Sequence, residues 1–340
     1  MEYHGSRLRA RGRRPGPAEP SWPKVIATTV RLWVERHPVY GRHATRRRQI
    51  TLTLVVAAVV ALGAGVVGAV LGHATTAPRA ATSPAASPPG GQPSQAAVAL
   101  GAAVTRGATA RWIAVQVAPS AVVACDPAMC AALQADGIAA TRLVVLGTAA
   151  ADPLGSDLVV ATAAVRSQFG ARLESVYAPA LVASFGTGTG RIDVRAIAPD
   201  GAAAYQSSAA ADRRDRISAG TQLLGNPRIT VAAAAQAALR AGDVDPRLLM
   251  LLAALAVQQP VRVGSFGDAA PGAGSAVPLR SAVIAPRASG AKAGALTQSL
   301  LSFIDAQRQP YLPLHTSLGG TSVLTVEYAA PSPLGLLSGP

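Results

Sequence analysis

The longest hydrophobic run of the chain covers residues 50–72. These 23 residues contain no charged side chain and no proline. At about 1.5 Å per residue, a helix of this length crosses a hydrocarbon core of ~30 Å. We therefore predict a transmembrane helix over 50–72. Small residues recur within it at every fourth position (Ala61, Gly65 and Ala69), a spacing that favours a homodimer through close helix packing, although an Ala/Gly-rich composition alone can produce it.

A second pattern precedes this run. In residues 22–37, Trp22, Ile26, Val30 and Trp33 recur at spacings of three and four, with polar residues between them. This periodicity predicts a short amphipathic helix that lies in the lipid headgroup layer. Docking on a cytoplasmic partner is the alternative.

Beyond residue 98, strand-like and helix-like hydrophobic patterns alternate. Strands are predicted over 121–125, 142–146, 157–161, 191–198, 261–266, 279–285 and 322–328. Helices are predicted over 99–117, 127–136, 163–169, 171–184, 202–222, 231–241, 246–258 and 292–308. Such alternation is typical of the α/β class, with layered helices on a largely parallel sheet. We predict two α/β subdomains, 99–200 and 201–335, with a single domain as the alternative.

The distribution of basic residues predicts the orientation. Residues 1–49 carry a net charge of +9, with Arg46, Arg47 and Arg48 next to the apolar run, whereas the much longer segment 73–340 carries +5. Because basic residues are retained on the cytoplasmic side, we expect a cytoplasmic tail at 1–49 and an exported C-terminal part. A cleaved signal peptide is the alternative, but the apolar run is longer than such peptides use.

Composition refines this assignment. The high pI suggests nucleic-acid binding, but most of the excess positive charge lies in the tail at 1–49. The exported part has no basic-aromatic pattern. We therefore expect the basic tail to face the lipid bilayer, and we expect no nucleic-acid partner. Residues 73–98, rich in Pro, Ala and Ser, predict an extended linker. The Ala, Arg, Gly and Pro bias resembles that of actinobacterial proteins.

Three Asp-Pro pairs mark helix starts: Asp126-Pro127, Asp152-Pro153 and Asp245-Pro246. Asp is a strong N-cap, and Pro fits the first helical turn because its missing N–H is not needed there. Gly242 is predicted to end one helix just before Asp245 begins the next. We therefore interpret these aspartates as structural.

Cys125 and Cys130 are the only cysteines. With Asp126 as N-cap, they occupy positions that touch in a hydrophobic staple. In an oxidising compartment this arrangement predicts a disulfide. Two free thiols, or a redox-active pair, remain alternatives.

The usual catalytic patterns are missing. The exported part has two histidines, His73 and His315, without metal-ligand spacing, and no nucleophile-elbow motif. The glycines of Gly186–Gly190 follow a predicted helix and precede a strand, the reverse of a phosphate-binding loop. We expect no catalytic, cofactor or metal site.

Two stretches resemble known families. Residues 112–195, which include WIAVQVAPSAVVACDPAMCAAL and VASFGTGTGRIDVR, look like the soluble extracytoplasmic domain of actinobacterial polytopic glycosyltransferases. That resemblance implies catalytic carboxylates in a membrane portion that this chain lacks. Residues 225–266 resemble part of cell-wall proteins related to D-Ala-D-Ala carboxypeptidases, without the histidine motif that follows there. Both resemblances imply an envelope protein.

These observations predict a single-pass plasma-membrane protein whose exported, non-catalytic α/β domain binds a cell-wall glycan or another envelope protein. An alternative is an envelope hydrolase or transferase with an unrecognised site around Asp126, Asp152, Asp157 or His315. A purely structural scaffold is a further alternative, which a broad, flat apolar patch would indicate.

Overall fold

The computed structural model describes residues 95–338, except 148–151, 268–269, 275 and 321. The predicted tail (1–49), its amphipathic helix (22–37), the membrane helix (50–72) and the linker up to residue 94 lie outside the described residues. Within the described part, every helix is too short or too polar to cross a bilayer. Residues 93–340 form one compact unit, so the division into 99–200 and 201–335 stays a prediction.

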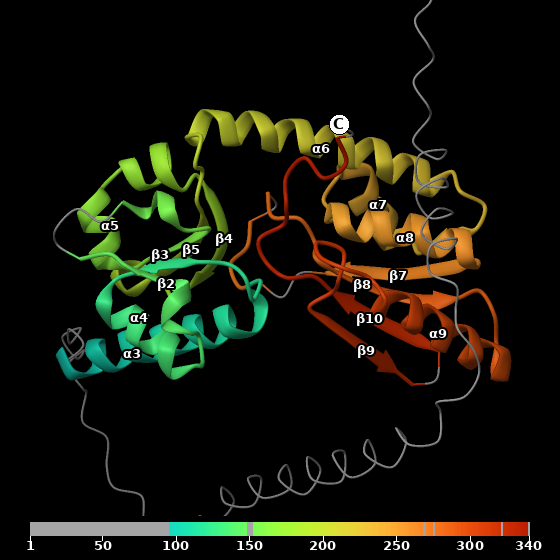
Figure 1. Ribbon diagram of the computed structural model, residues 1–340, viewed down its shortest axis with the longest axis horizontal. Helices are drawn as coiled ribbons and strands as arrows, with labels where there is room; N and C mark the ends of the chain where they lie inside the picture. The colour runs from blue at the N-terminus through green and yellow to red at the C-terminus, as the bar shows by residue number, and fades with distance from the viewer. Residues whose placement is uncertain (1–94, 148–151, 268–269, 275, 321, 339–340) are drawn as a thin grey trace, which may run out of the picture. The chain divides into compact units, whose positions relative to one another are not determined.

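The first sheet is buried on both faces (Figure 1). Its strands, in spatial order, are β2 (Leu143–Val145), β1 (Val123–Cys125), β3 (Leu158–Ala161), β5 (Ile192–Ala196) and β4 (Ala180–Phe185). Helices α3 (Gln95–Gln116) and α4 (Pro127–Ala135) pack on one face and α5 (Ala163–Phe169) packs on the other. Since both faces are covered, β1, β3 and β5 have no exposed residue, which explains the uninterrupted apolar sequences of β1 and β3.

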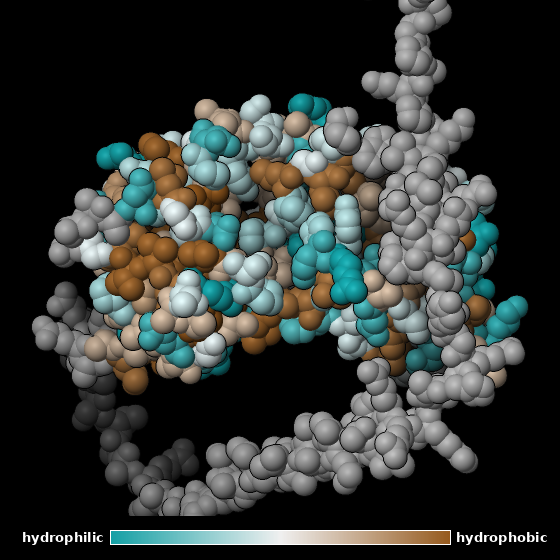
Figure 2. All heavy atoms as spheres, in the orientation of Figure 1, coloured by the Kyte–Doolittle hydropathy of each residue, from teal (hydrophilic) through white to brown (hydrophobic). Residues whose placement is uncertain are grey.

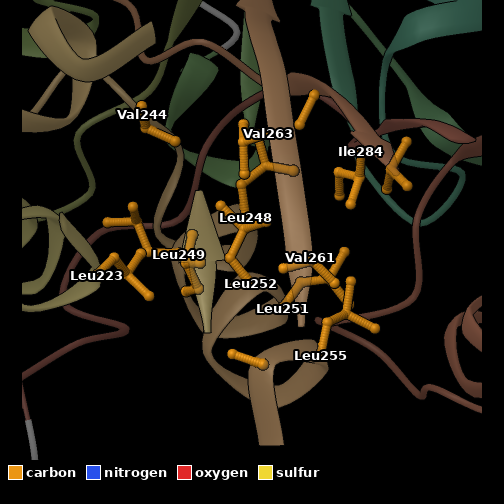
Figure 3. Packing of buried hydrophobic residues seen from close by; sticks show 14 of the residues in the cluster. Leu223, Val244, Leu248, Leu249, Leu251, Leu252, Leu255, Val261, Val263 and Ile284 are labelled. Atoms are coloured by element: carbon orange, nitrogen blue, oxygen red, sulfur yellow. The ribbon is translucent and has the colours of Figure 1, made fainter. Parts of the chain in front are cut away.

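The second sheet is buried on one face. Its spatial order is β6 (Ile229–Val231), β7 (Val261–Gly267), β8 (Ser281–Pro286), β10 (Val323–Glu327) and β9 (His315–Gly319). Buried residues alternate with more exposed ones along β7, β8 and β10. The helices that contribute to the core on the buried face include α7 (Ala233–Ala241), α8 (Pro246–Gln258) and α9 (Gly290–Asp305). Figure 3 shows side chains of α8, among them Leu248 and Leu252, packed beside Val261 and Val263.

The two sheets share a topological unit. In the first, β3 is followed by α5 and then by the hairpin β4–β5, in the spatial order β3-β5-β4. In the second, β8 is followed by α9 and then by the hairpin β9–β10, in the order β8-β10-β9. Helix α6 (Ala202–Leu224) connects the sheets in the chain. Its packing against α7 and α8 places its buried face beside the second core.

The α/β class is confirmed, but the prediction of a largely parallel sheet is wrong. Among the described strands, three pairings are parallel and five are antiparallel. The parallel pairings are β1–β2, β1–β3 and β6–β7. The error has a physical cause: hairpins such as β4–β5 return the chain directly to the adjacent position, without the crossover helix that a parallel strand requires.

The predicted helix over 171–184 is also wrong. One π-helical turn, Leu173–Tyr177, is followed by strand β4. Pro179 lies inside the predicted helix, where it would remove a hydrogen bond and clash with the preceding turn. The following apolar residues instead pair with β5. Consequently, Gly186–Gly190 connects two strands of a hairpin and does not follow a helix. Strands β6 and β9 were not predicted.

Candidate binding cleft

Helix α6 carries a buried ion pair on an otherwise Ala-rich sequence. Asp212 and Arg216 lie one turn apart, and Arg216 Nε donates to an Asp212 carboxylate oxygen at 2.8 Å. Arg216 also donates to the carbonyl of Gly242, and the Gly335 N–H donates to Asp212 at 3.1 Å. Burial raises the pKa of Asp212, while the attraction of Arg216 opposes that shift.

A second buried cluster forms at the start of α8. Asp245 caps the helix by accepting from the Arg247 N–H at 2.8 Å, and its two carboxylate oxygens accept from Arg247 Nε at 2.9 Å and from a terminal guanidinium nitrogen at 2.7 Å. Ser332 Oγ donates to the same carboxylate at 2.6 Å. The Arg247 guanidinium also lies 4.9 Å from the ring centroid of Tyr328. Burial raises the pKa of that Tyr328 hydroxyl.

The C-terminal strap, residues 328–338, joins these clusters to the end of α3 (Figure 1, red segment ending near α6). Ala330 exchanges backbone hydrogen bonds with the end of α3, from its N–H to Gln116 at 2.8 Å and from the Ala118 N–H to its carbonyl at 3.0 Å. Farther along, Ser332, Gly335 and Ser338 bond to three aspartates: Asp245, Asp212 and Asp215. The strap therefore contacts α3, α6 and α8.

A cleft of about 560 Å³ lies where α6, strand β4, the loop before β8 and the strap meet. Its walls are mainly apolar, including Leu181 and Val182 of β4 and Val277 of the loop. A second cavity, of about 490 Å³, shares Tyr205 and three strap residues with the first. Both volumes fall within the range of ~300–1,000 Å³ that is usual for ligand pockets.

Charged side chains in the lining of the larger cleft are mostly cationic. Arg213, Arg216 and Arg280 contribute guanidinium groups, and Asp243 contributes the one carboxylate among the described lining residues. Arg213 and Asp243 form an exposed pair at 3.3 Å, with Arg213 side chain 54% exposed. An exposed pair of this length contributes little to stability, so the Arg213 guanidinium is available to another carboxylate.

Strand β4 presents its unpaired edge to the cleft. It is the last strand of its sheet and has an irregularity in its pairing between Leu181 and Ala183. At its far end, the Ser184 N–H donates to the carbonyl of Pro271 at 2.7 Å, and Gly272 approaches so closely that an added Cβ would lie 2.9 Å from Ser184. The loop thus covers the edge at Ser184 and then separates from it, leaving residues 180–182 in the cleft wall.

A third ion-pair cluster supports the β4–β5 hairpin. Asp193, 1% exposed, accepts from Arg191 Nε at 2.8 Å and from Ser184 Oγ at 2.7 Å. Burial raises the pKa of Asp193, but the bonds from Arg191 and Ser184 outweigh this effect and hold that pKa below its ordinary value.

This lowered pKa predicts a pH-dependent contribution to stability. The ionised Asp193 stabilises the fold fully above the unfolded-state pKa of about 3.9, and that contribution disappears as the pH falls through the lower folded-state pKa. We expect Asp193→Asn to lose about 1–3 kcal/mol of unfolding free energy at pH 7. The loss should shrink as the pH falls below about 3.9. Denaturant titrations at several pH values measure the difference, with exposed Asp200→Asn as the control; a loss that does not vary with pH would contradict the assignment.

The structure separates the residues considered for an unrecognised catalytic site. Asp126 caps α4 by accepting from the Met129 N–H at 2.9 Å, and Asp152 caps a short 3₁₀ turn by accepting from the Leu154 N–H at 2.9 Å. Together with the Asp245 cap, these bonds confirm the structural interpretation of the three Asp-Pro pairs. Asp157 accepts from the Val122 N–H at 2.7 Å and lines the smaller cavity. His315 Nε2 lies 3.3 Å from the Val115 carbonyl, on edge strand β9.

Cys125 and Cys130 are joined by a disulfide, as predicted, with Cα atoms 5.4 Å apart. Cys125 ends β1 and Cys130 lies in the first turns of α4, so the bond connects the strand to the helix that follows it. Both residues are buried.

Removing the disulfide should lower stability moderately. Because the closed loop is short, we expect the double variant Cys125→Ala/Cys130→Ala to lose about 2 kcal/mol of unfolding free energy. Denaturant titration measures this loss, and reduced wild-type protein should show a similar one. An unchanged midpoint in both samples would contradict the expectation.

Sequence reasoning did not identify the cleft. The signal lay in the run DRRDR at 212–216, where charges at a spacing of four interrupt an Ala-rich helix. In the described part of the chain, three or more His, Cys, Asp or Glu residues nowhere form a group that could hold a metal ion. Comparison of the chain with protein-family models, with curated proteins and with solved structures found no match.

Proposed function

We propose that the chain is a single-pass plasma-membrane protein with a cytoplasmic N-terminus, and that its exported α/β unit binds another envelope protein in the cleft beside β4. The proposal retains the membrane helix at 50–72 and a homodimer through it. The charge difference between 1–49 and 73–340 supports the orientation.

The cleft itself is the observation that carries the binding role. It combines mainly apolar walls with a few charged groups, a composition typical of ligand sites. By contrast, Asp212, Asp245 and Asp193 are each held by an arginine and by further hydrogen bonds. These aspartates are arranged to stabilise the fold, so we favour binding over hydrolysis or group transfer.

A scaffold role has less support. Figure 2 shows the hydrophobic side chains of the visible face in several separate clusters, with hydrophilic side chains between them. A scaffold that packs through a broad apolar patch would present a continuous one. A wall glycan is the second candidate for the ligand. The chemical nature of a crosslinked adduct distinguishes a glycan from a protein.

Photocrosslinking in intact cells tests this function. A photoreactive amino acid replaces Ala276, an exposed residue of the cleft wall, and in a matched control it replaces Val257, which is 51% exposed on α8. We expect a protein adduct at position 276 and none at 257. External protease should remove the C-terminal part from intact cells. If that part is protected in intact cells but cleaved in inverted vesicles, the proposed orientation is wrong. If the crosslinked adduct at position 276 is a glycan, the ligand is a wall polymer and not a protein.

A further inference from the structure

We propose that the cleft binds an extended polypeptide segment that adds to the edge of β4 as a further strand and places an acidic side chain against Arg213 and Arg216. This inference rests on the proposed function and narrows its ligand to a polypeptide of stated chemistry.

The first support is the exposed ladder edge. Among the described strands, β4 has a neighbour on the β5 side alone. One backbone hydrogen bond, from the Ser184 N–H to the carbonyl of the loop residue Pro271, shows that this edge accepts a backbone partner. Residues 180–182 then line the cleft, over a length of about 7–10 Å, so there is space for two to four residues of an added strand. Strand addition of this kind derives affinity from main-chain hydrogen bonds.

The second support is the chemistry of the two walls. On one side, Leu181 of β4 and Val277 of the opposite loop provide apolar contacts for the side chains of the added strand. On the other side, Arg213 and Arg216 are three residues apart on α6 and both line the cleft. Guanidinium groups bind carboxylates in a bidentate manner, so they select an acidic side chain.

Arg216 and Arg213 differ in how firmly the fold holds them. Arg216 is held rigidly by Asp212 and by the Gly242 carbonyl, and it is 6% exposed, so its position costs little further entropy on binding. Arg213 is held more loosely, by Ala241 at 3.1 Å and by Asp243 at 3.3 Å. A ligand carboxylate can therefore replace Asp243 as the partner of Arg213 without leaving a buried charge unpaired.

The test uses the full chain in detergent micelles and a phage-displayed library of random dodecapeptides. We expect selected peptides to share one acidic residue within an alternating apolar pattern. Arg213→Glu should weaken their binding by at least about tenfold, because it replaces attraction by repulsion. Arg308→Glu, which makes the same charge change at an exposed loop position, should leave it unchanged.

Two further measurements keep the outcome decisive. Ala276→Trp should abolish binding by filling the cleft without changing its charge, and thermal unfolding will verify that each variant folds. Amide hydrogen exchange at residues 180–182 should slow when a peptide binds. Absence of selected peptides, binding insensitive to Arg213→Glu, or binding without slowed exchange would each overturn strand addition. Displacement of the peptides by millimolar acetate or phosphate would identify a small-anion site and would also overturn strand addition.

Failure of this inference is distinguishable from failure of the proposed function. If a protein adduct forms at position 276 in cells but is unaffected by Arg213→Glu, the envelope-binding function stands and strand addition fails. If no adduct forms and the C-terminal part is not exported, the proposed function fails, whereas peptide selection on the purified chain still tests the cleft.

Discussion

Asp245→Ala is expected to lower the free energy of unfolding by about 3–5 kcal/mol. Asp245 is fully buried and accepts two hydrogen bonds from the Arg247 guanidinium, one from the Arg247 backbone and one from Ser332. Removing the carboxylate leaves the buried guanidinium, 7% exposed, without its counter-charge and removes the N-cap of α8. Denaturant titration at pH 7 measures the loss.

Asp243→Ala is the matched control, because Asp243 lies two residues earlier and forms an exposed pair with Arg213. Such pairs contribute about 0–1 kcal/mol. Asp245→Asn should fall between the two, since its amide oxygen still accepts a helix N–H while the charge is lost. Equal losses for Asp245→Ala and Asp243→Ala would show that the buried cluster does not stabilise the fold.

Gly220→Ala is expected to cost about 2–3 kcal/mol. Gly220 lies on the buried face of α6, where a Cβ atom would be placed 2.3 Å from the backbone carbonyl oxygen of Leu239 in α7. Atoms do not approach so closely, and a backbone carbonyl cannot rotate away as a flexible side chain can. The two helices must therefore separate, which disrupts the core beneath them.

Gly101→Ala provides the contrast. Gly101 lies in α3, is exposed, and has no atom within 4 Å of an added Cβ. There, replacement of glycine should stabilise the helix by about 0.5–1 kcal/mol. Opposite signs for these two variants in thermal unfolding are the expected result; a Gly220→Ala protein as stable as the wild type would mean that α6 and α7 do not pack as described.

Local chemistry made several features predictable. The Asp126 and Asp245 caps follow from the affinity of a short carboxylate for free N–H groups at a helix start, which depends on neighbouring residues alone. The same holds for Gly242, which ends α7 in the left-handed conformation with φ +69°. The disulfide was predictable because Cys125 and Cys130 flank one such cap.

Strand β4 illustrates what local patterns could not resolve. The run ALVASF at 180–185 fits a buried helix or a buried strand equally well, and the choice depends on whether β5 is available as a partner. The relative direction of neighbouring strands also depends on which strands become partners. It could not be predicted from sequence, because parallel and antiparallel strands have the same apolar sequences when both faces of the sheet are buried.

The cleft depends on still longer separations. Its walls come from β4, α6, the loop before β8 and the strap, and its lining runs from Pro179 to Leu334 in the chain. The Asp212 carboxylate meets Gly335 across 123 residues, and Asp245 meets Ser332 across 87. Spacing rules reach at most a few helical turns, so they could not bring these groups together.

The sequence by itself determined the α/β class, the helix caps and the disulfide, because each arises from residues within a few positions of one another. Tertiary structure alone decided the direction of the strands, the β4 edge and the arginine-lined cleft. The physical reason is that strand pairing, charge burial and cavity shape depend on which distant segments meet, and that is determined by the packing of the whole unit.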